Sequence, residues 1–345
     1  MPGPVPALDI EEVTTIEALE KLRPEWSALW ARCPTSTLFQ SPEWLIPWWR
    51  HIGEGELWTL VLRQAGRLVG LAPLYIYVKP GSSEREVFLL GIATTDYLDA
   101  LFDQEFASSG AAAVFARLDA ARHRWDVCDL QQLRPQSPLL NAPMPEDWHE
   151  EVTRQEPCLF LELPTAVGEF PRLLSRRTRK NLRYYWHRAE IMGPACVERA
   201  NERNLDELLG ALFRLQRARW SARGLAEMSA TEAVRKAHWE TAPALLSHGA
   251  LRLYGLRLAD RIVASLYGFT YTTAGKKQAS AYLSGFDPSL EGLSLGTLVL
   301  DYAVQEAIRE GAAEFDFLRG REAYKYHWRP KERLTYRRRL WHTRA

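Results

Sequence analysis

The sequence lacks the features of a membrane-spanning or secreted protein. No apolar run reaches 18 residues, and the opening stretch MPGPVPALDIEE has neither the basic start nor the apolar centre of a signal peptide. The four cysteines lie 30 or more residues apart without paired spacing, which fits neither a disulfide framework nor a zinc site. We therefore expect a cytoplasmic protein in which all four are reduced: Cys33, Cys128, Cys158 and Cys196.

Metal-ligand spacing and a strong net charge are missing too. The eight histidines are scattered, and no two have the i, i+4 spacing that places ligands on one helix face, so we expect no metal. A net charge of +1 argues against a surface that binds nucleic acid generally. The basic residues are instead concentrated in two segments. Residues 176–188, RRTRKNLRYYWHR, hold six Arg or Lys and no acid, and residues 329–344 hold seven with one acid, Glu332.

The sequence does contain alternating strand and helix patterns, which predict an α/β (α+β) fold. Two stretches, 57–78 and 251–271, each read as a strand, a tight turn and a second strand. They align at a constant offset of 194 residues, which places RQAGRLVG over RLADRIVA. The repeated hairpin indicates an internal duplication.

The order of elements after each hairpin supports the duplication. Each hairpin is followed by a predicted helix and then by a strand that carries an Asp among apolar residues, Asp129 in VCDL and Asp316 in EFDF. A Pro-containing connector at 134–157 separates the two halves. We expect tandem domains at 1–150 and 151–345, each with a mixed sheet flanked by helices.

Residues 284–311, SGFDPSLEGLSLGTLVLDYAVQEAIREG, are the most informative stretch for chemistry. A strand ends near Ser284, and an amphipathic helix begins near Ser294. Unpaired amides at a helix start suit a phosphate, and Gly292 and Gly296 would let a ligand approach the backbone. The structural alternative is a tight turn in which the glycines have no ligand and Ser294 caps the helix.

The chain resembles the superfamily that shares the fold of Gcn5-related N-acetyltransferases (GNAT). Within it, the chain is similar to a two-domain bacterial branch that includes cellulose-biosynthesis-associated acetyltransferase-like proteins and is akin to the Fem peptidyltransferases. The segments that carry the resemblance are FQSPEWLIPWW (39–49), GRLVGLAPLYI (66–76), DYLDALF (96–102), FRLQRARWSARG (213–224), ADRIVASLYGF (259–269) and FDFLRGREAYKYHW (315–328).

The resemblance implies acyl transfer from a thioester, with acetyl-CoA or another acyl-CoA as co-substrate. Its pyrophosphate would lie at Gly292, Ser294, Leu295, Gly296 and Thr297, although GLSLG lacks the family's leading basic residue and spaces its glycines more widely. In the second domain a strand edge at 282–285 would donate a backbone N–H to the oxyanion. Tyr324 would protonate the leaving thiolate, and the acceptor would be an amine or hydroxyl of a sugar or cell-envelope precursor.

Other polar residues are candidates for the base or the acceptor pocket. Asp316, Glu322 and Asp287 could accept the proton, and Arg319 or Lys325 could pair with Asp316, either structurally or to orient substrate. In the first domain the acids of DYLD cap a turn or bind a polar acceptor. The predicted substrate-binding residues are Asp96, Asp99, Trp220, Arg319 and Lys325.

Three interpretations of segment 176–188 remain open. It forms a solvated helix face, it contacts an anionic substrate or the 3′-phosphate of CoA, or it binds RNA. The Fem relatives use aminoacyl-tRNA, so the resemblance keeps aminoacyl transfer as an alternative function, although nucleic acid is not the expected partner. A non-catalytic accessory module of polysaccharide production is a further alternative.

Overall fold

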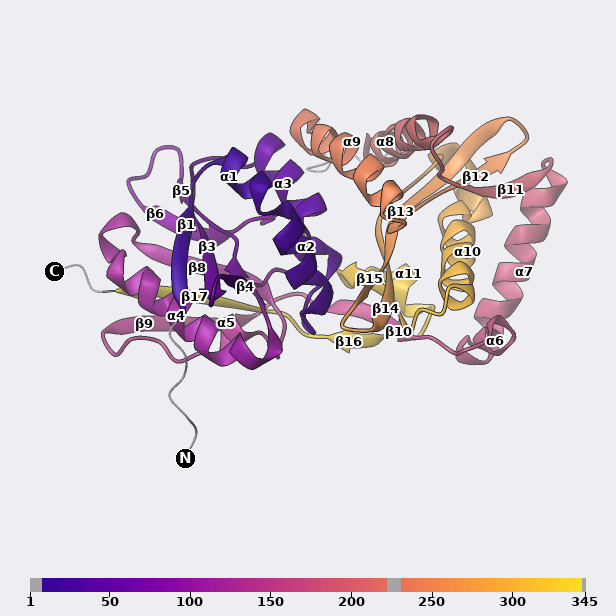
Figure 1. Cartoon of the computed structure of the whole chain (residues 1–345). Helices are drawn as coiled ribbons and strands as arrows, with labels where there is room; N and C mark the ends of the chain where they lie inside the picture. The colour runs from indigo at the N-terminus through magenta and orange to yellow at the C-terminus, as the bar shows by residue number, and fades with distance from the viewer. Residues whose placement is uncertain (1–7, 222–230, 343–345) are drawn as a thin grey trace. The chain divides into compact units, whose positions relative to one another are not determined.

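The computed structural model describes residues 8–221 and 231–342, apart from the side chain of Trp220. The chain divides into two compact units (Figure 1). Unit 1 consists of Met1–Glu156, Thr273–Gly275 and Leu334–Ala345, and unit 2 of Pro157–Thr272 and Lys276–Arg333. Mixed β-sheets flanked by helices build both units, which confirms the predicted fold class.

Unit 1 contains two sheets, with strand orders β1-β3-β4-β7 and β2-β5-β6-β8-β17-β9. Its strands are β1 (Asp9–Val13), β2 (Glu56–Leu57), β3 (Thr59–Gln64), β4 (Arg67–Ala72), β5 (Leu74–Val78), β6 (Arg85–Leu89), β7 (Leu101–Phe102), β8 (Val127–Leu133), β9 (Trp148–Arg154) and β17 (Tyr336–His342). Its α-helices are α1 (Ile16–Lys21), α2 (Arg23–Arg32), α3 (Pro42–His51), α4 (Ala107–Ala120) and α5 (Pro138–Asn141). Short 3-10 turns lie at Leu38–Gln40, Gln104–Phe106 and Arg122–Arg124.

Unit 2 is built on a seven-stranded sheet with the order β11-β12-β13-β14-β15-β10-β16. Its strands are β10 (Cys158–Glu162), β11 (Ala195–Arg199), β12 (Leu251–Leu258), β13 (Arg261–Thr273), β14 (Lys276–Phe286), β15 (Glu314–Arg319) and β16 (Lys331–Arg333). Its α-helices are α6 (Phe170–Leu173), α7 (Arg176–Ile191), α8 (Leu205–Ser221), α9 (Glu232–Ser247), α10 (Leu295–Arg309) and α11 (Ala323–Tyr326), with 3-10 turns at η4 (Val167–Glu169) and η6 (Pro288–Leu293).

Helix α10 forms the central connection of unit 2. Its apolar side chains recur at helical spacing, and Leu295, Leu298 and Ile308 are buried in the core, as the sequence predicts, while Tyr302 is partly buried. Helix α7 packs beside α10 through Leu182 and Ala189 (Figure 1). The core therefore holds the start of α10 in a fixed position at the end of β14.

The two hairpins have the same backbone and the same side-chain contact. The turn residues Ala65 and Ala259 both have a left-handed backbone, with φ of 48° and 49°. Arg63 Nη1 donates to the carbonyl of Gly66 at 3.0 Å, and Arg257 Nη1 donates to that of Asp260 at 3.1 Å. A register shift precedes each of these arginines. The structure thus confirms the predicted duplication down to a single hydrogen bond.

The strands that follow each hairpin also correspond. Helix α4 connects β6 to β8 and helix α10 connects β14 to β15, and both strand pairs are parallel. The parallel register ends at Phe88↔Asp129 in unit 1 and at Ser280↔Asp316 in unit 2. The two aspartates that the sequence aligned therefore occupy equivalent positions.

The end of the chain belongs to unit 1, whereas the sequence placed residues 334–345 in the second domain. Strand β17 pairs antiparallel with both β8 and β9. Leu340 is buried in the unit 1 core, and Arg337 donates to both oxygens of Asp129 at 2.8 and 2.5 Å. The physical reason is the ladder itself, since β17 satisfies the backbone groups on the facing edges of β8 and β9.

Candidate active site

The candidate active site lies in unit 2, where two parallel strands separate. β14 and β15 are paired from Gln278↔Glu314 to Ser280↔Asp316. Beyond this point β14 continues to Phe286 and β15 to Arg319, and no further pairing joins these two described strands. Residues 282–285 lie on the stretch of β14 that is no longer paired with β15.

The turn from β14 into α10 has an unusual backbone. After η6, Ser294 has a left-handed conformation with φ of 52° and ψ of 41°. Ser294 stands at the N-cap of α10, as in the structural alternative, but its hydroxyl makes no capping hydrogen bond to the described helix. Its carbonyl accepts from the amide of Thr297 at 2.9 Å. The amides of Leu295 and Gly296 remain at the positive start of α10, where the helix supplies no carbonyl for them.

The two glycines of this turn have different surroundings. A Cβ on Gly296 would lie 3.3 Å from Cδ1 of Phe286, whereas a Cβ on Gly292 would meet nothing within 4 Å. Leu295 is buried, while Gly296 and Thr297 are half-buried and Gly292 is exposed. The requirement for a small residue therefore falls on Gly296.

A basic residue next to this turn comes from α7. Arg188 Nη1 donates to the carbonyl of Gly292 at 3.1 Å, and its guanidinium carbon lies 5.7 Å from the ring centre of Tyr184. The sequence showed no basic residue at the start of the turn itself. Because Arg188 lies 104 residues before Gly292, sequence spacing gave no signal of this contact.

Tyr324 lies on α11, just after the chain leaves β15. Its side chain is 38% exposed. Desolvation, and to a smaller extent the Glu322 carboxylate, raise the pKa of Tyr324 to about 12, while Arg219 opposes the rise. Tyr324 therefore keeps its proton at neutral pH, which is the state required of a proton donor.

Arg219 of α8 is a residue that the sequence did not single out. Its charge acts on Tyr324, and its guanidinium carbon lies 5.0 Å from the ring centre of Phe286. Phe286 also lies next to Gly296. Arg219 at the end of α8 is therefore close to both the start of α10 and Tyr324. The only sequence signal was the basic stretch FRLQRARWSARG, which does not reveal which arginine faces the sheet.

Lys325, a predicted substrate ligand, is buried and already satisfied. Its Nζ donates to the carbonyls of Leu318, Arg319 and Gly320 at 3.2, 2.6 and 3.4 Å. It also pairs with Glu322 at 3.0 Å. Lys325 therefore fastens α11 to the end of β15, and it positions Tyr324 by doing so.

The carboxylates predicted as bases all have partners. Asp316 pairs with Arg333 at 2.9 Å, a partner that the sequence did not predict, and accepts from the amide of Leu318. Lys325, the other expected partner, pairs with Glu322 instead. β16 brings Arg333 beside β10, where its guanidinium lies over the ring of Phe160. Arg319 is half-buried at the end of β15, where it pairs with Cys158 in the ladder.

Asp287 is held by hydrogen bonds at the end of β14. Its carboxylate accepts from the amide and hydroxyl of Ser289 at 3.0 and 2.6 Å, and Arg261 lies at 3.0 Å. The Ser289 hydroxyl and then, against the opposing burial, the Ser289 amide and Arg261 lower the pKa of Asp287. A carboxylate stabilised in this way is a weak base.

Two of the predicted substrate-binding residues belong to unit 1. Asp96 and Asp99 are buried in unit 1, where one Asp99 oxygen accepts from Ser137 Oγ and from the amide of Ala100, both at 2.9 Å. Burial raises the pKa of Asp99 to about 7, against Ser137, Arg134 and the Ala100 amide. Trp220 lies in α8, but its side chain is outside the described residues.

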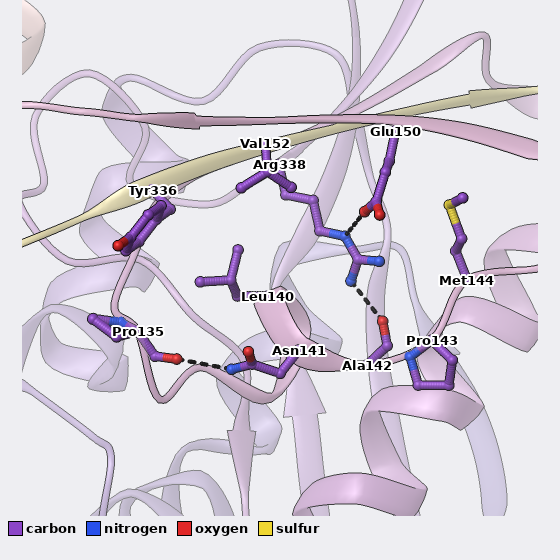
Figure 2. Close-up of a pocket in the computed structure, with 10 residues that line it drawn as sticks. All are labelled: Pro135, Leu140, Asn141, Ala142, Pro143, Met144, Glu150, Val152, Tyr336 and Arg338. Atoms are coloured by element: carbon purple, nitrogen blue, oxygen red, sulfur yellow. Dashed lines mark hydrogen bonds and ion pairs between the residues drawn. The ribbon is translucent and has the colours of Figure 1, made fainter.

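A pocket of about 580 Å³ in unit 1 includes none of the predicted site residues (Figure 2). Arg338 lies against it, with Nε bonded to Glu150 at 3.0 Å and Nη1 bonded to the carbonyls of Leu139 and Ala142 at 2.8 Å. Its remaining wall is mostly apolar, with Leu140, Met144 and Val152 around the opening. Because Arg338 is used within unit 1, we assign this pocket no part in the reaction.

Two absences concern residues 8–221 and 231–342. No group of three or more His, Cys, Asp or Glu is placed to hold a metal ion. No helix in these ranges is long and apolar enough to cross a membrane.

Comparison with known proteins finds a family model that matches the part of the chain holding this geometry. Residues 176–326, which hold the separating strands, α10 and Tyr324, match the family described as acetyltransferase (GNAT) domain. A search of curated proteins finds no match. The match to the GNAT domain supports acyl transfer in general and leaves donor and acceptor open.

Solved structures of low sequence identity share the fold over nearly the whole chain. A crystal structure of FemX is 11% identical, covers 95% of this chain and 96% of its own, and has a TM-score of 0.65. A conserved protein of unknown function from Bacteroides thetaiotaomicron is 13% identical over 97% and 100%, with a TM-score of 0.60. The C-terminal domain of a putative lysylphosphatidylglycerol synthetase from Agrobacterium fabrum is 14% identical over 93% and 91%, with a TM-score of 0.57.

These likenesses confirm the predicted GNAT-type fold, which FemX shares. Membership of the narrower cellulose-biosynthesis branch stays a prediction. At this level of sequence identity, the solved structures show that the fold is shared and nothing about function.

Proposed function

We propose that the chain transfers an acyl group from an acyl-CoA to an amine, or to a hydroxyl, of a sugar or cell-envelope precursor, in an active site within unit 2. One observation carries the proposal. β14 and β15 separate after Ser280 and Asp316, and the start of α10 and Tyr324 follow directly from the two separated ends. This is the arrangement needed to hold a thioester between a phosphate site and a proton donor.

The start of α10 is the proposed phosphate site. The amides of Leu295 and Gly296 belong to the first turn of α10, which is the positive end of the helix dipole. The half-buried Ser294 and Thr297 lie beside them in sequence. Arg188 adds a positive charge at Gly292 and takes the place of the basic residue that the turn lacks. The donor's pyrophosphate would lie along these residues, with its pantetheine arm between β14 and β15.

The reaction needs a balanced transfer of one acyl group and one proton. A neutral amine attacks the thioester carbonyl, the C–N bond forms, and an amide of residues 282–285 stabilises the oxyanion. The C–S bond then breaks, and the thiolate takes the proton of Tyr324, whose pKa near 12 keeps it protonated beforehand. The proton released by the amine returns to the tyrosinate through solvent.

Water is the proposed carrier of that proton, because the nearby carboxylates are engaged. Asp316 is bonded to Arg333, Glu322 to Lys325 and Asp287 to Ser289 and Arg261. Arg219 is proposed to assist protonation of the departing sulfur, because a cation beside Tyr324 favours loss of the tyrosine proton. These roles are proposals for a donor-bound state.

Unit 1 is not proposed as a second active site, because its own chain fills the equivalent place. Beyond Phe88↔Asp129, the amide of Leu98 donates to the carbonyl of Gln132 at 3.2 Å. Tyr97, Leu98 and Ala100 are buried there. A donor inserted between β6 and β8 would have to displace this segment.

Calorimetric titration with acetyl-CoA and longer acyl-CoAs tests the donor assignment. We expect one binding site per chain, with heat that depends on the acyl length. Absence of binding to every acyl-CoA would remove the proposed donor. A thioester-cleavage assay with sugar amines as acceptors then tests transfer itself.

Aminoacyl transfer from tRNA is the alternative within the same chemistry, and the fold likeness to FemX favours it. It predicts tight binding of aminoacyl-tRNA that weakens steeply with salt, with no binding of acyl-CoA. A non-catalytic accessory module in polysaccharide production predicts donor binding without turnover. Filter binding with tRNA and the thioester assay separate the three.

A further inference from the structure

Helix α7 has an outer face that the proposed reaction does not use. Its exposed residues lie on one side of the helix when placed at 100° per residue. We call this side the outer face of α7, and it consists of Arg176, Arg177, Lys180, Arg183, Tyr184, His187, Glu190 and Ile191. The opposite side is fixed, since Leu182 and Ala189 are buried and Trp186 Nε1 donates to Asp301 at 3.4 Å.

The cations of the outer face are not neutralised by the protein. Within the described residues, Arg176, Arg177, Lys180 and Arg183 have no ion pair. By contrast, Arg199, Arg252, Arg257 and Arg333 of unit 2 are each ion-paired. The acid of α7 is Glu190, in the last turn. A partner with negative charge would therefore find about four unpaired cations along a helix of about 24 Å.

Large apolar side chains are exposed in the same place. Ile191 is 71% exposed, Met192 55%, Tyr184 53%, and Leu173 of α6 38%. Four of the nine most exposed large apolar side chains in the described chain thus lie in residues 173–192, so this is a local feature. Exposed aliphatic groups beside unpaired cations are typical of a helix that lies on a lipid surface.

Two hydrogen bonds place this helix beside the proposed active site. Near its start, Thr178 Oγ1 donates to the carbonyl of His327, which follows α11. At its end, Arg188 donates to Gly292 in the turn before α10. Residues of α7 outside the outer face therefore contact the chain next to Tyr324 and next to the proposed phosphate site.

We propose that the outer face of α7 docks on a bilayer of anionic phospholipid. The charge is complementary to such a surface, and Ile191, Met192 and Leu173 can enter the boundary between head groups and acyl chains. RNA would use the arginines and Tyr184 but would leave the aliphatic side chains in water.

Sedimentation with vesicles tests the proposal on the full chain. Vesicles of phosphatidylcholine with phosphatidylglycerol should bind the protein, vesicles of phosphatidylcholine alone should not, and salt should weaken the binding. Each basic residue at an anionic surface strengthens binding by about fivefold, so K180E with R183E should weaken it by about 25-fold or more. Ile191→Ser with Met192→Ser should weaken it with the charge unchanged.

A matched control and an RNA arm complete the experiment. K236E with K276E makes the same charge change at two exposed lysines away from α7 and should bind vesicles nearly as the parent chain does. Failure of the parent chain to bind anionic vesicles overturns the proposal, as does an equal loss in the control. Tight tRNA binding that K180E with R183E abolishes, without vesicle binding, would assign the face to RNA instead. Donor binding by calorimetry is measured separately, so the proposed reaction can fail or hold on its own.

Discussion

Tyr324 and Tyr326 lie on the same turn of helix α11 but in different surroundings. Partial burial raises the pKa of Tyr324 and the charge of Arg219 lowers it, whereas the hydroxyl of Tyr326 donates to Glu332 at 3.1 Å. Tyr324→Phe keeps the ring and removes the proton, so kcat should fall by about 100-fold while the KM for the donor changes little. Tyr326→Phe is the matched control and should retain activity. Steady-state kinetics measure both, and an unchanged kcat in Tyr324→Phe contradicts the assigned role.

Asp99 gives a prediction about stability and pH. The second carboxylate oxygen of Asp99 is buried without a hydrogen-bond partner. Burial raises the pKa of Asp99 to about 7 from the ordinary value of 3.8. Between about pH 4 and pH 7 the folded chain holds a proton that the unfolded chain releases. The free energy of unfolding should therefore fall as pH rises through this window, by up to about 4 kcal/mol, and level off above it.

Asp99→Asn isolates this effect from the other titrating groups. The variant should be more stable than the parent chain at pH 8, with a smaller gain at pH 5, because the amide carries no charge to bury. Denaturant unfolding at the two pH values measures the difference. An equal change at both values would show that Asp99 is ionised in the folded chain.

The residue scale also shows where sequence reasoning was limited. Tyr324 could be proposed because it follows the strand FDFL, a local relation. The partner of Asp316 could not, because Arg333 reaches it through the pairing of β16 with β10. Lys325 looked like a ligand because its charge is visible in sequence, while the three carbonyls that bind it are not.

At the scale of elements, the turn before α10 is the proposed donor site. Gly296→Val should lower acyl-CoA affinity, because its Cβ meets Phe286 at 3.3 Å and its branches would crowd the first amides of the helix. Gly292→Ala should bind nearly as the parent chain does, since its Cβ meets nothing within 4 Å. Calorimetry should give a loss of about tenfold or more for Gly296→Val. Equal affinities in the two variants would place the donor elsewhere.

Element type was well predicted where the apolar pattern was long and local. The amphipathic pattern of Ser294 to Glu310 predicted α10, which runs from Leu295 to Arg309. The left-handed backbone at Ser294 was not predictable, because positive φ values favour glycine and two glycines stood nearby. The surrounding η6 and Leu295 hold this conformation, which is a tertiary effect.

At the scale of the molecule, the return of β17 makes the chain's end part of unit 1. Truncation after Arg333 should unfold unit 1, because β8 and β9 lose the strand between them. Leu340→Ala is the graded form and should cost about 2–5 kcal/mol, since the side chain is fully buried. Denaturant unfolding measures both variants. Unchanged stability in Leu340→Ala would contradict the packing of β17.

The duplication was readable from the sequence, and the return of the chain was not. A constant offset of 194 residues linked the two hairpins, whose turns share a left-handed alanine and the same arginine contact. Strand pairing between β17 and β8 joins residues about 200 apart, and the basic segment 329–344 gave no hint of its partner. Non-local pairing of this kind leaves little local signal.

A crystal structure with bound CoA tests the central claim most directly. The account predicts that pyrophosphate lies at the amides of Leu295 and Gly296 in unit 2, beside Arg188, and that the sulfur reaches the Tyr324 hydroxyl. CoA bound in unit 1, or bound in unit 2 with its sulfur away from Tyr324, would contradict it.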